Sequence, residues 1–298
     1  MSDSNPSQVP LVIAHRGASG YRPENTLAAF ELGISQGADG IEFDVVNTKD
    51  SKLIIRHENL LSQTTNIKDS EMFAGLKRAG NLGEEMHSDW YSEDLTLEEV
   101  KSLRAVERVP DLRPGSAKFD GEFEIPTLKE VLDCQFLTNK KVVVEIKSGS
   151  HLSVLKESIG TLTAQAILES SAISNNLHLY VESFDHDLLL ETKVELQKTG
   201  ITAKYFLAID STKIVDVDLV GLAKEFDGLS IATHMLLSQD TWVESCHALG
   251  LQVWVYTARA ENATTTIEAY YEELIQTGVD AIFADQPDLL RRVLDERG

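Results

Sequence analysis

Short apolar runs recur along the chain and alternate with longer stretches of mixed polar and apolar residues. Nine runs have the length and the valine, isoleucine and aromatic content of β-strands: 11–14, 41–46, 53–56, 142–146, 177–181, 203–208, 228–232, 252–256 and 281–284. Most are separated by segments of helical character, among them 27–36, 128–136, 153–169, 188–197, 241–249 and 263–277. This alternation predicts repeated βα units around a parallel sheet.

One connection is too short to fit this pattern. Only Thr48-Lys49-Asp50-Ser51 join the second and third strands, whereas a crossover between parallel strands needs about a dozen residues or more. These two strands must therefore form an antiparallel hairpin. Setting the return strand aside leaves eight parallel strands, the number that closes a (β/α)8 TIM barrel. We expect residues 1–298 to form one barrel domain.

The segment 59–124 interrupts the alternation of strands and helices. Glycines and charged residues are scattered through it, and only 97–104 has a clear helical pattern. Structureless stretches of this length are uncommon in compact domains unless they form lids or binding loops. We interpret the segment as an inserted small cap that leaves the barrel directly after His57.

Two helix starts carry a recognisable capping pattern. Thr96 with Glu99, and Thr127 with Glu130, match the capping box, in which a hydroxyl and a carboxylate bind the free backbone amides of the first turn. These pairs predict helices that begin directly after each threonine.

Net charge limits the partners of the protein. Its 27 lysines and arginines oppose 48 aspartates and glutamates, which leaves a formal charge of −21. So large an acidic excess repels nucleic-acid backbones and anionic lipid headgroups, so we expect no nucleic-acid partner and no stable membrane association. An anionic small molecule would need locally placed cations. The oligomeric state is left open.

The N-terminus and the cysteine content bear on localisation. No basic start with an apolar run marks a signal peptide, and no stretch approaches the roughly 18 apolar residues of a transmembrane helix. Cys134 and Cys246 are too few for a disulfide framework. These features favour the cytoplasm, although a chain from which a leader had been removed would look the same.

The first strand ends in two chemically active residues. His15 and Arg16 stand at its carboxyl end, where the active sites of barrels are built. An imidazole exchanges protons near neutral pH, and a guanidinium binds phosphate with paired hydrogen bonds. A lone histidine is more often a structural residue of a turn, but the neighbouring strands favour a functional site.

The second strand carries two carboxylates on one face. Glu42 and Asp44 are two residues apart, so their side chains point the same way, while Ile41, Phe43 and Val45 point the other way. Inside a closed barrel two such carboxylates would repel each other unless a cation lay between them. A hard divalent ion explains the pair. The alternative is the solvated face of an edge strand.

The hairpin brings a second histidine towards this pair. A two-residue loop at 50–51 places His57 opposite Asp44, and a three-residue loop shifts the register by one position. With either loop, His57 lies within cross-strand reach of the carboxylates. Two histidines on either side of a metal ion suit general acid and general base roles.

The strand 142–146 repeats the pattern. Glu145 and Lys147 share one face at its carboxyl end, where Glu145 could complete a metal shell and Lys147 could neutralise a phosphoryl oxygen. A buried ion pair is the alternative. On the strand 252–256, Trp254 and Tyr256 also share a face, where they could either stack on a substrate or pack inside the barrel.

Taken in order, these motifs resemble those of the glycerophosphodiester phosphodiesterase family. The opening motif is matched by His15-Arg16-Gly17-Ala18-Ser19-Gly20 with Pro23-Glu24-Asn25-Thr26, the second by Glu42-x-Asp44-Val45, the third by Thr48-Lys49-Asp50 leading to His57, and the fourth by Glu145-Ile146-Lys147. Ser183-Phe184-Asp185 and the closing run 278–287 match as well. The matches cover nearly the whole chain, and the long segment after His57 resembles the insertion-bearing branch of the family.

The resemblance implies a fold, a reaction and a cofactor. The fold is a (β/α)8 barrel, and the reaction is the hydrolysis of glycerophosphodiesters to sn-glycerol 3-phosphate and an alcohol. The implied ligands of one divalent cation, Ca²⁺ or Mg²⁺, are Glu42, Asp44 and Glu145.

The resemblance also implies roles for the remaining site residues. His15 would accept a proton and His57 would donate one, although these roles could be reversed. Arg16 and Lys147 would lie beside the phosphate. Trp254 and Tyr256 are candidate contacts of the glycerol moiety.

Two other functions are compatible with a barrel of this kind. A lipid phosphodiesterase acting on lysophospholipids would call for an apolar surface or a basic membrane patch, which the net charge disfavours. A noncatalytic sugar-phosphate-binding barrel would be expected to lack a catalytic group, yet both histidines and all three acids are present. The preferred alcohol, the metal, and the choice between water and the glycerol 2-hydroxyl as first nucleophile stay open.

Overall fold

Eight parallel strands close into a barrel, as the sequence predicts. The computed structural model describes residues 9–82, 85–210, 217–238 and 241–297. The barrel strands are β1 (Leu11–His15), β2 (Gly40–Asn47), β6 (Lys141–Ile146), β7 (His178–Ser183), β8 (Lys204–Ile209), β9 (Gly228–Ala232), β10 (Gln252–Ala258) and β11 (Ala281–Ala284). Their order follows the chain, and β1 pairs with both β2 and β11, which closes the sheet. The predicted TIM barrel is confirmed.

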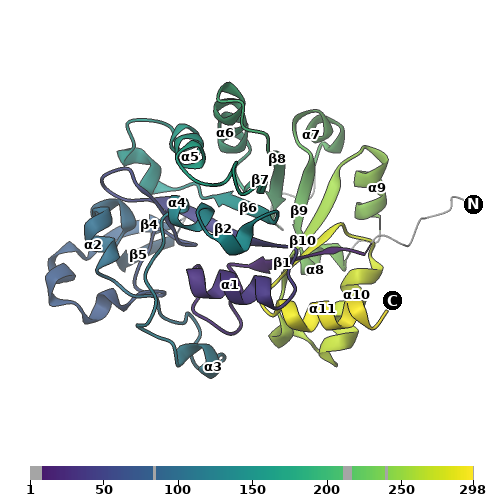
Figure 1. The fold of residues 1–298 in the computed structure, drawn as a ribbon, viewed down its shortest axis with the longest axis horizontal. Coiled ribbons are helices and arrows are strands. Elements are labelled where there is room, and N and C mark those ends of the chain that lie inside the picture. The colour runs from purple at the N-terminus through teal and green to yellow at the C-terminus, as the bar shows by residue number, and fades with distance from the viewer. Residues whose placement is uncertain (1–8, 83–84, 211–216, 239–240, 298) are drawn as a thin grey trace, which may run out of the picture.

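Helices surround the barrel on its outside (Figure 1). The main ones are α1 (Leu27–Ser35), α4 (Leu128–Leu132), α5 (Ile159–Leu168), α6 (His186–Lys198), α7 (Leu219–Glu225), α8 (Thr233–Leu236), α9 (Trp242–Ala248), α10 (Ile267–Gln276) and α11 (Pro287–Asp295). Within the described parts of the chain, none is long and apolar enough to cross a lipid bilayer.

The predicted helix boundaries hold at some positions and are wrong at others. Both capping boxes are present, at Thr96 and at Thr127. The predicted helix 153–169 is instead a 3-10 turn, Ser150–Val154, followed by α5, because the Ser158 side chain caps the amide of Thr161 and starts a new helix there. The predicted helix 128–136 likewise ends early, since α4 stops at Leu132 and a 3-10 turn, Gln135–Leu137, follows.

The strands separate two layers of apolar side chains. Ile41, Phe43 and Val45 of β2 belong to the large cluster between the sheet and the outer helices. A smaller cluster fills the barrel and contains Ile13, Val143, Tyr180, Phe206, Trp254, Ala281 and Phe283. Because side chains alternate along a strand, the packing of Ile41, Phe43 and Val45 on the outside directs Glu42 and Asp44 to the inside.

The hairpin pairs β2 with β3 (Leu53–Ile55) and settles the register that the sequence left open. Val45 faces Ile55 and Asn47 faces Leu53. The amide of Thr48 donates to the Lys52 carbonyl, so the loop has three residues, 49–51. Ser51 adopts a left-handed backbone with φ 58°, as the last residue of such a loop often does. The backbone carbonyl of Asp44 therefore accepts a hydrogen bond from the amide of Arg56, and His57 lies one position further on.

The segment 59–124 contains more regular structure than the sequence indicated. Its elements are the 3-10 turns Asn66–Asp69, Glu71–Leu76 and Ser92–Asp94, the antiparallel hairpin of β4 (Arg78–Leu82) and β5 (Glu85–Asp89), and the helices α2 (Leu97–Lys101) and α3 (Pro114–Ala117). An apolar cluster of its own, including Phe73, Trp90 and Val100, packs on Val46 and Ile54 of the barrel hairpin. Figure 1 shows the insertion beside β2, with α3 near α1.

Candidate active site

The site residues lie at the carboxyl ends of three adjacent strands. His15 is the last residue of β1 and is in register with Glu42 of β2. Asp44 of β2 is in register with Glu145 of β6. Parallel pairing thus brings together residues that lie up to 130 positions apart, at the end of the barrel where active sites form.

Glu42, Asp44 and Glu145 form a buried carboxylate cluster. One oxygen from each lies within 4.8 Å of the others, and their exposed fractions are 1%, 0% and 6%. Burial, together with the charges of Asp44 and Glu145, raises the pKa of Glu42 well above its usual range. Its Oε1 is buried without a hydrogen-bond partner. Oxygen donors in this arrangement fit a hard divalent cation.

Two positively charged side chains, Lys147 and Arg16, border the carboxylate cluster. Lys147 Nζ lies 2.8 Å from Asp44 Oδ1 and also contacts Glu145. Arg16 Nε lies 3.3 Å from Asp44 Oδ2. Burial opposes ionisation of Asp44, but Lys147 and Arg16 outweigh it and hold the pKa of that carboxyl well below its usual range. Lys147 thus makes the buried ion pair that the sequence left as its alternative, and the place of both side chains beside a phosphate stays a prediction.

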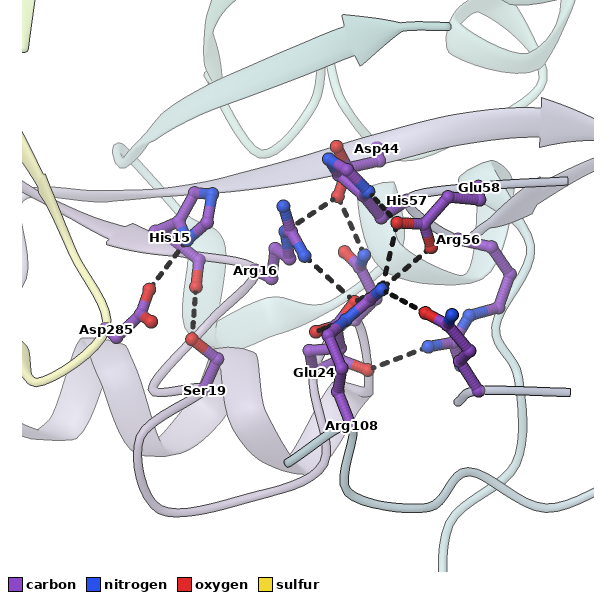
Figure 2. A network of polar contacts seen from close by, with 12 residues as sticks. His15, Arg16, Ser19, Glu24, Asp44, Arg56, His57, Glu58, Arg108 and Asp285 are labelled. Carbon is purple, nitrogen blue, oxygen red and sulfur yellow. Dashed lines mark hydrogen bonds and ion pairs between the residues drawn. The ribbon is translucent and has the colours of Figure 1, made fainter. Parts of the chain in front are cut away.

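Each histidine is held by a carboxylate through Nδ1. His15 Nδ1 donates to Asp285 Oδ1 at 2.6 Å, while its Nε2 lies 3.9 Å from Glu42 Oε2. His57 Nδ1 donates to Glu58 Oε1 at 2.5 Å. Burial and the charge of Arg16 lower the pKa of both imidazoles to about 4, against the opposing effect of their carboxylates. Figure 2 shows Arg16 between the two histidines.

The loop after β1 is shaped to present its polar groups to the cluster. Arg16 and Asn25 have left-handed φ angles of 55° and 59°, a conformation that costs non-glycine residues energy and often marks functional sites. Asn25 Nδ2 donates to Asp44 Oδ2 at 2.8 Å. At Gly17, also left-handed, a Cβ would lie 2.4 Å from the backbone of Ala29, so only glycine allows this close approach to α1.

The two aromatic candidates occupy different environments. Trp254 has no exposed surface and packs against Tyr180, Phe206 and Phe283 inside the barrel, so barrel packing accounts for it. Tyr256 is partly exposed, donates a hydrogen bond to the Ile209 carbonyl and makes an edge contact with Phe184. We therefore keep Tyr256 alone as a candidate substrate contact.

Sequence reasoning missed several polar residues of the site. Asp285 follows directly after β11, so the rule that barrel sites use strand ends could have singled it out. Glu182 of β7 is in register with Glu145 and bonds Ser230, and burial raises its pKa to about 8. Nothing in the sequence pattern distinguishes Glu58, directly before the insertion, or Arg108, within it.

The fold and the site define a class of enzyme. A barrel whose mouth holds clustered carboxylates, two carboxylate-bound histidines and two cations is equipped for hydrolysis of a phosphate ester. The sequence model described as the glycerophosphoryl diester phosphodiesterase family matches residues 15–289. The chain belongs to this family and is a phosphoric diester hydrolase.

Similar proteins agree over nearly the full length. A glycerophosphodiester phosphodiesterase of Caldanaerobacter subterraneus subsp. tengcongensis is 31% identical over 293 residues, which cover 97% of this chain and 99% of the relative. A Bacillus subtilis enzyme of the same name is 29% identical, with 95% and 86% covered. The solved structure of an Oleispira antarctica phosphodiesterase, in complex with its product sn-glycerol-3-phosphate, has a TM-score of 0.68 at 24% identity and covers 96% and 97% of the two chains.

Proposed function

We propose that this enzyme hydrolyses water-soluble glycerophosphodiesters to sn-glycerol 3-phosphate and an alcohol, using one divalent cation and two histidines. The observation that carries the proposal is the arrangement of His15 and His57, each with Nδ1 bound by a carboxylate, around one buried carboxylate cluster. The product seen in the Oleispira antarctica structure supports the choice of sn-glycerol 3-phosphate.

Glu42, Asp44 and Glu145 would hold the cation, Ca²⁺ or Mg²⁺. When bound, it would supply a positive charge that polarises the phosphoryl group. Arg16 and Lys147 lie at the same cluster and would neutralise the nonbridging oxygens of the phosphate as charge develops there. The ion pairs that they make with Asp44 keep both side chains directed towards the site.

The histidines would move the protons through Nε2. Because Nδ1 donates to Asp285 or Glu58, Nε2 is the atom left to exchange protons with the substrate. At His15 this nitrogen has one long contact, 3.5 Å from the Thr257 hydroxyl. A lowered pKa leaves His15 neutral at pH 7, as a proton acceptor requires. For His57 to donate, its imidazolium must form, and both Glu58 and a bound phosphate anion stabilise that form. The reverse assignment is an outcome of the tests below.

The first nucleophile is either water or the 2-hydroxyl of the substrate's own glycerol. The second route passes through a cyclic glycerophosphate, which ³¹P NMR would detect during turnover. A glycerophosphodiester lacking the 2-hydroxyl would react only by the first route. These two measurements decide between the nucleophiles.

One assay tests the function against its alternatives. The protein is incubated with glycerophosphocholine, glycerophosphoethanolamine and lysophosphatidylcholine, first with EDTA and then with added Ca²⁺ or Mg²⁺. We expect metal-dependent hydrolysis of the first two. Cleavage of lysophosphatidylcholine alone would favour a lipid phosphodiesterase. Binding of glycerol 3-phosphate without turnover of any substrate would favour a noncatalytic barrel.

The remaining expectations rest on charge and pattern. The net charge of −21 is our reason to exclude nucleic acid and a stable membrane association among the partners. A single domain over 1–298 and a cytoplasmic location remain proposals.

A further inference from the structure

We propose that Arg108 and Arg113, both supplied by the insertion, are positioning residues that hold the carboxylates orienting the two histidines. This inference rests on the proposed function, because it assigns the insertion a part in the His15 and His57 chemistry. The two arginines are five residues apart, yet each reaches a different histidine through a different carboxylate.

Arg108 binds both oxygens of the Glu58 carboxylate, which is also the partner of His57. Its Nη1 lies 2.9 Å from Glu58 Oε1 and its Nη2 lies 2.7 Å from Oε2, a two-pronged contact. Oε1 is also the atom that accepts from His57 Nδ1. Because both oxygens of Glu58 are engaged, the plane of the carboxylate is fixed, and with it the direction of the imidazole.

The guanidinium of Arg108 is also linked to Arg16, because both side chains bind Glu24. Arg108 Nε and Nη2 lie 2.9 and 2.7 Å from the two oxygens of Glu24, and Glu24 Oε1 accepts from Arg16 at 3.1 Å. Figure 2 shows Arg108 between Glu24 and Glu58. One residue of the insertion is therefore bound to the partner of His57 and to the partner of Arg16.

Arg113 performs the corresponding role at the other histidine. Its Nη2 lies 2.5 Å from Asp285 Oδ2, its Nε lies 2.7 Å from Glu261 Oε1, and its Nη1 donates to the Ser19 carbonyl. Arg259 also binds Asp285 Oδ2, which leaves Oδ1 to His15. With two arginines on one oxygen, the other oxygen is held at the imidazole.

The segment that carries both arginines is itself braced. The amide of Arg113 donates to the Val109 carbonyl at 2.9 Å, and the amide of Val109 donates to Glu107 Oε1 at 3.0 Å. Side-chain exposures of 21% for Arg108 and 9% for Arg113 mean that water competes little for the contacts. The insertion thus holds the geometry of both histidines in addition to bordering the mouth.

The test compares Arg108→Gln, Arg108→Lys and Arg113→Gln with a matched control, Arg78→Gln. Arg78 lies in the same insertion and pairs with Glu93 and Asp94, whereas the carboxylates bound to Nδ1 of His15 and His57 are those of Asp285 and Glu58. We expect Arg108→Gln to lower kcat roughly 10- to 100-fold, the usual range for residues that orient a ligand or catalytic group. The decrease for Arg113→Gln should be smaller, since Arg259 still binds Asp285. Arg108→Lys keeps the positive charge but not the two-pronged contact, so its kcat should lie between those of Arg108→Gln and the wild type.

A second readout does not depend on turnover. In ¹⁵N-histidine-labelled, metal-free protein, NMR reports which imidazole nitrogen carries the proton, with His15→Gln and His57→Gln used for assignment. We expect Arg108→Gln to change the His57 signals and not those of His15, and Arg113→Gln to do the reverse.

A rescue experiment uses a further variant, Arg108→Ala. Millimolar guanidinium should restore part of its activity.

Separate outcomes overturn the two proposals. If the imidazole signals are unchanged in both variants, or if Arg78→Gln loses as much kcat at equal thermal stability, the positioning role is wrong. If the wild-type protein hydrolyses no glycerophosphodiester while the signals change as expected, the proposed function fails and the positioning role stands.

Discussion

His15 and Asp285, 270 positions apart in the chain, form a direct contact of 2.6 Å between Nδ1 and Oδ1. The contact exists because β1 pairs with β11, which brings the first and the last strand of the barrel together. Asp285 follows β11 and His15 ends β1, so closure of the barrel places the carboxylate beside the imidazole. It directs Nε2 of His15 towards the carboxylate cluster.

Replacing Asp285 by asparagine should disable His15 without removing it. The Nδ1–H would lose its ionised partner, and the imidazole could take the other tautomer. We expect kcat to fall by roughly 10²- to 10⁴-fold, as for losses of other orienting carboxylates. Asp288→Asn, which affects a residue bonded to Tyr21, is the control and should keep nearly full activity. Steady-state kinetics on glycerophosphocholine makes the comparison, and an unchanged kcat in Asp285→Asn would contradict the role of the contact.

His15 and His57 should have separable roles. A general acid matters most when the leaving group is poor, so His57→Ala should cripple hydrolysis of glycerophosphoethanolamine but spare a p-nitrophenyl ester. His15→Ala should slow both substrates by roughly 10²- to 10⁴-fold, because the nucleophile must still be activated. Circular dichroism must first show that both variants fold. Equal losses on both substrates would mean that the assignment is wrong and that one histidine binds phosphate instead.

Removing one acid from the cluster should leave the Tm of the metal-free protein equal or higher, and should lower the gain in Tm that metal brings. In metal-free protein Glu42, Asp44 and Glu145 repel one another, so Glu42→Gln should match or exceed the wild-type Tm. Added Ca²⁺ or Mg²⁺ should stabilise the wild type, by about 2.7 kcal/mol at a hundredfold excess over Kd. That gain should be largely absent in Glu42→Gln and intact in Glu130→Gln, whose carboxylate caps α4. Differential scanning fluorimetry measures both, and an equal metal-induced rise in Glu42→Gln would rule out the proposed ligand set.

Stability at acid pH should report the network around Glu58. Burial opposes its ionisation, but His57 and Arg108 outweigh burial and lower the pKa of Glu58 from 4.5 to about 2. A lowered folded-state pKa adds stability that is present above pH 4.5 and is lost as the pH falls towards 2. We therefore expect Glu58→Gln to be less stable than the wild type at pH 7, with a difference that shrinks between pH 4.5 and 2. Urea titrations across this range test it, and a difference that stays constant would show that Glu58 is not held as an ion.

The sequence by itself determines the barrel and the chemistry placed on its strands. Alternation between outward apolar residues and inward acids in β2 is a local pattern, and so is the short loop that forces a hairpin after Asn47. The capping boxes at Thr96 and Thr127 are equally local, because each involves residues three positions apart. Patterns of this kind can be recognised without knowing where the rest of the chain lies.

Only the tertiary structure decided which partners hold those residues. The contact of Asp285 with His15 depends on the pairing of β1 with β11, and the contacts of Arg108 and Arg113 depend on how the insertion packs against the mouth. The burial of Trp254 among three aromatic rings depends on closure in the same way. These contacts join residues far apart in the chain, and no local pattern encodes them, because their energy comes from groups that meet only after the barrel has closed.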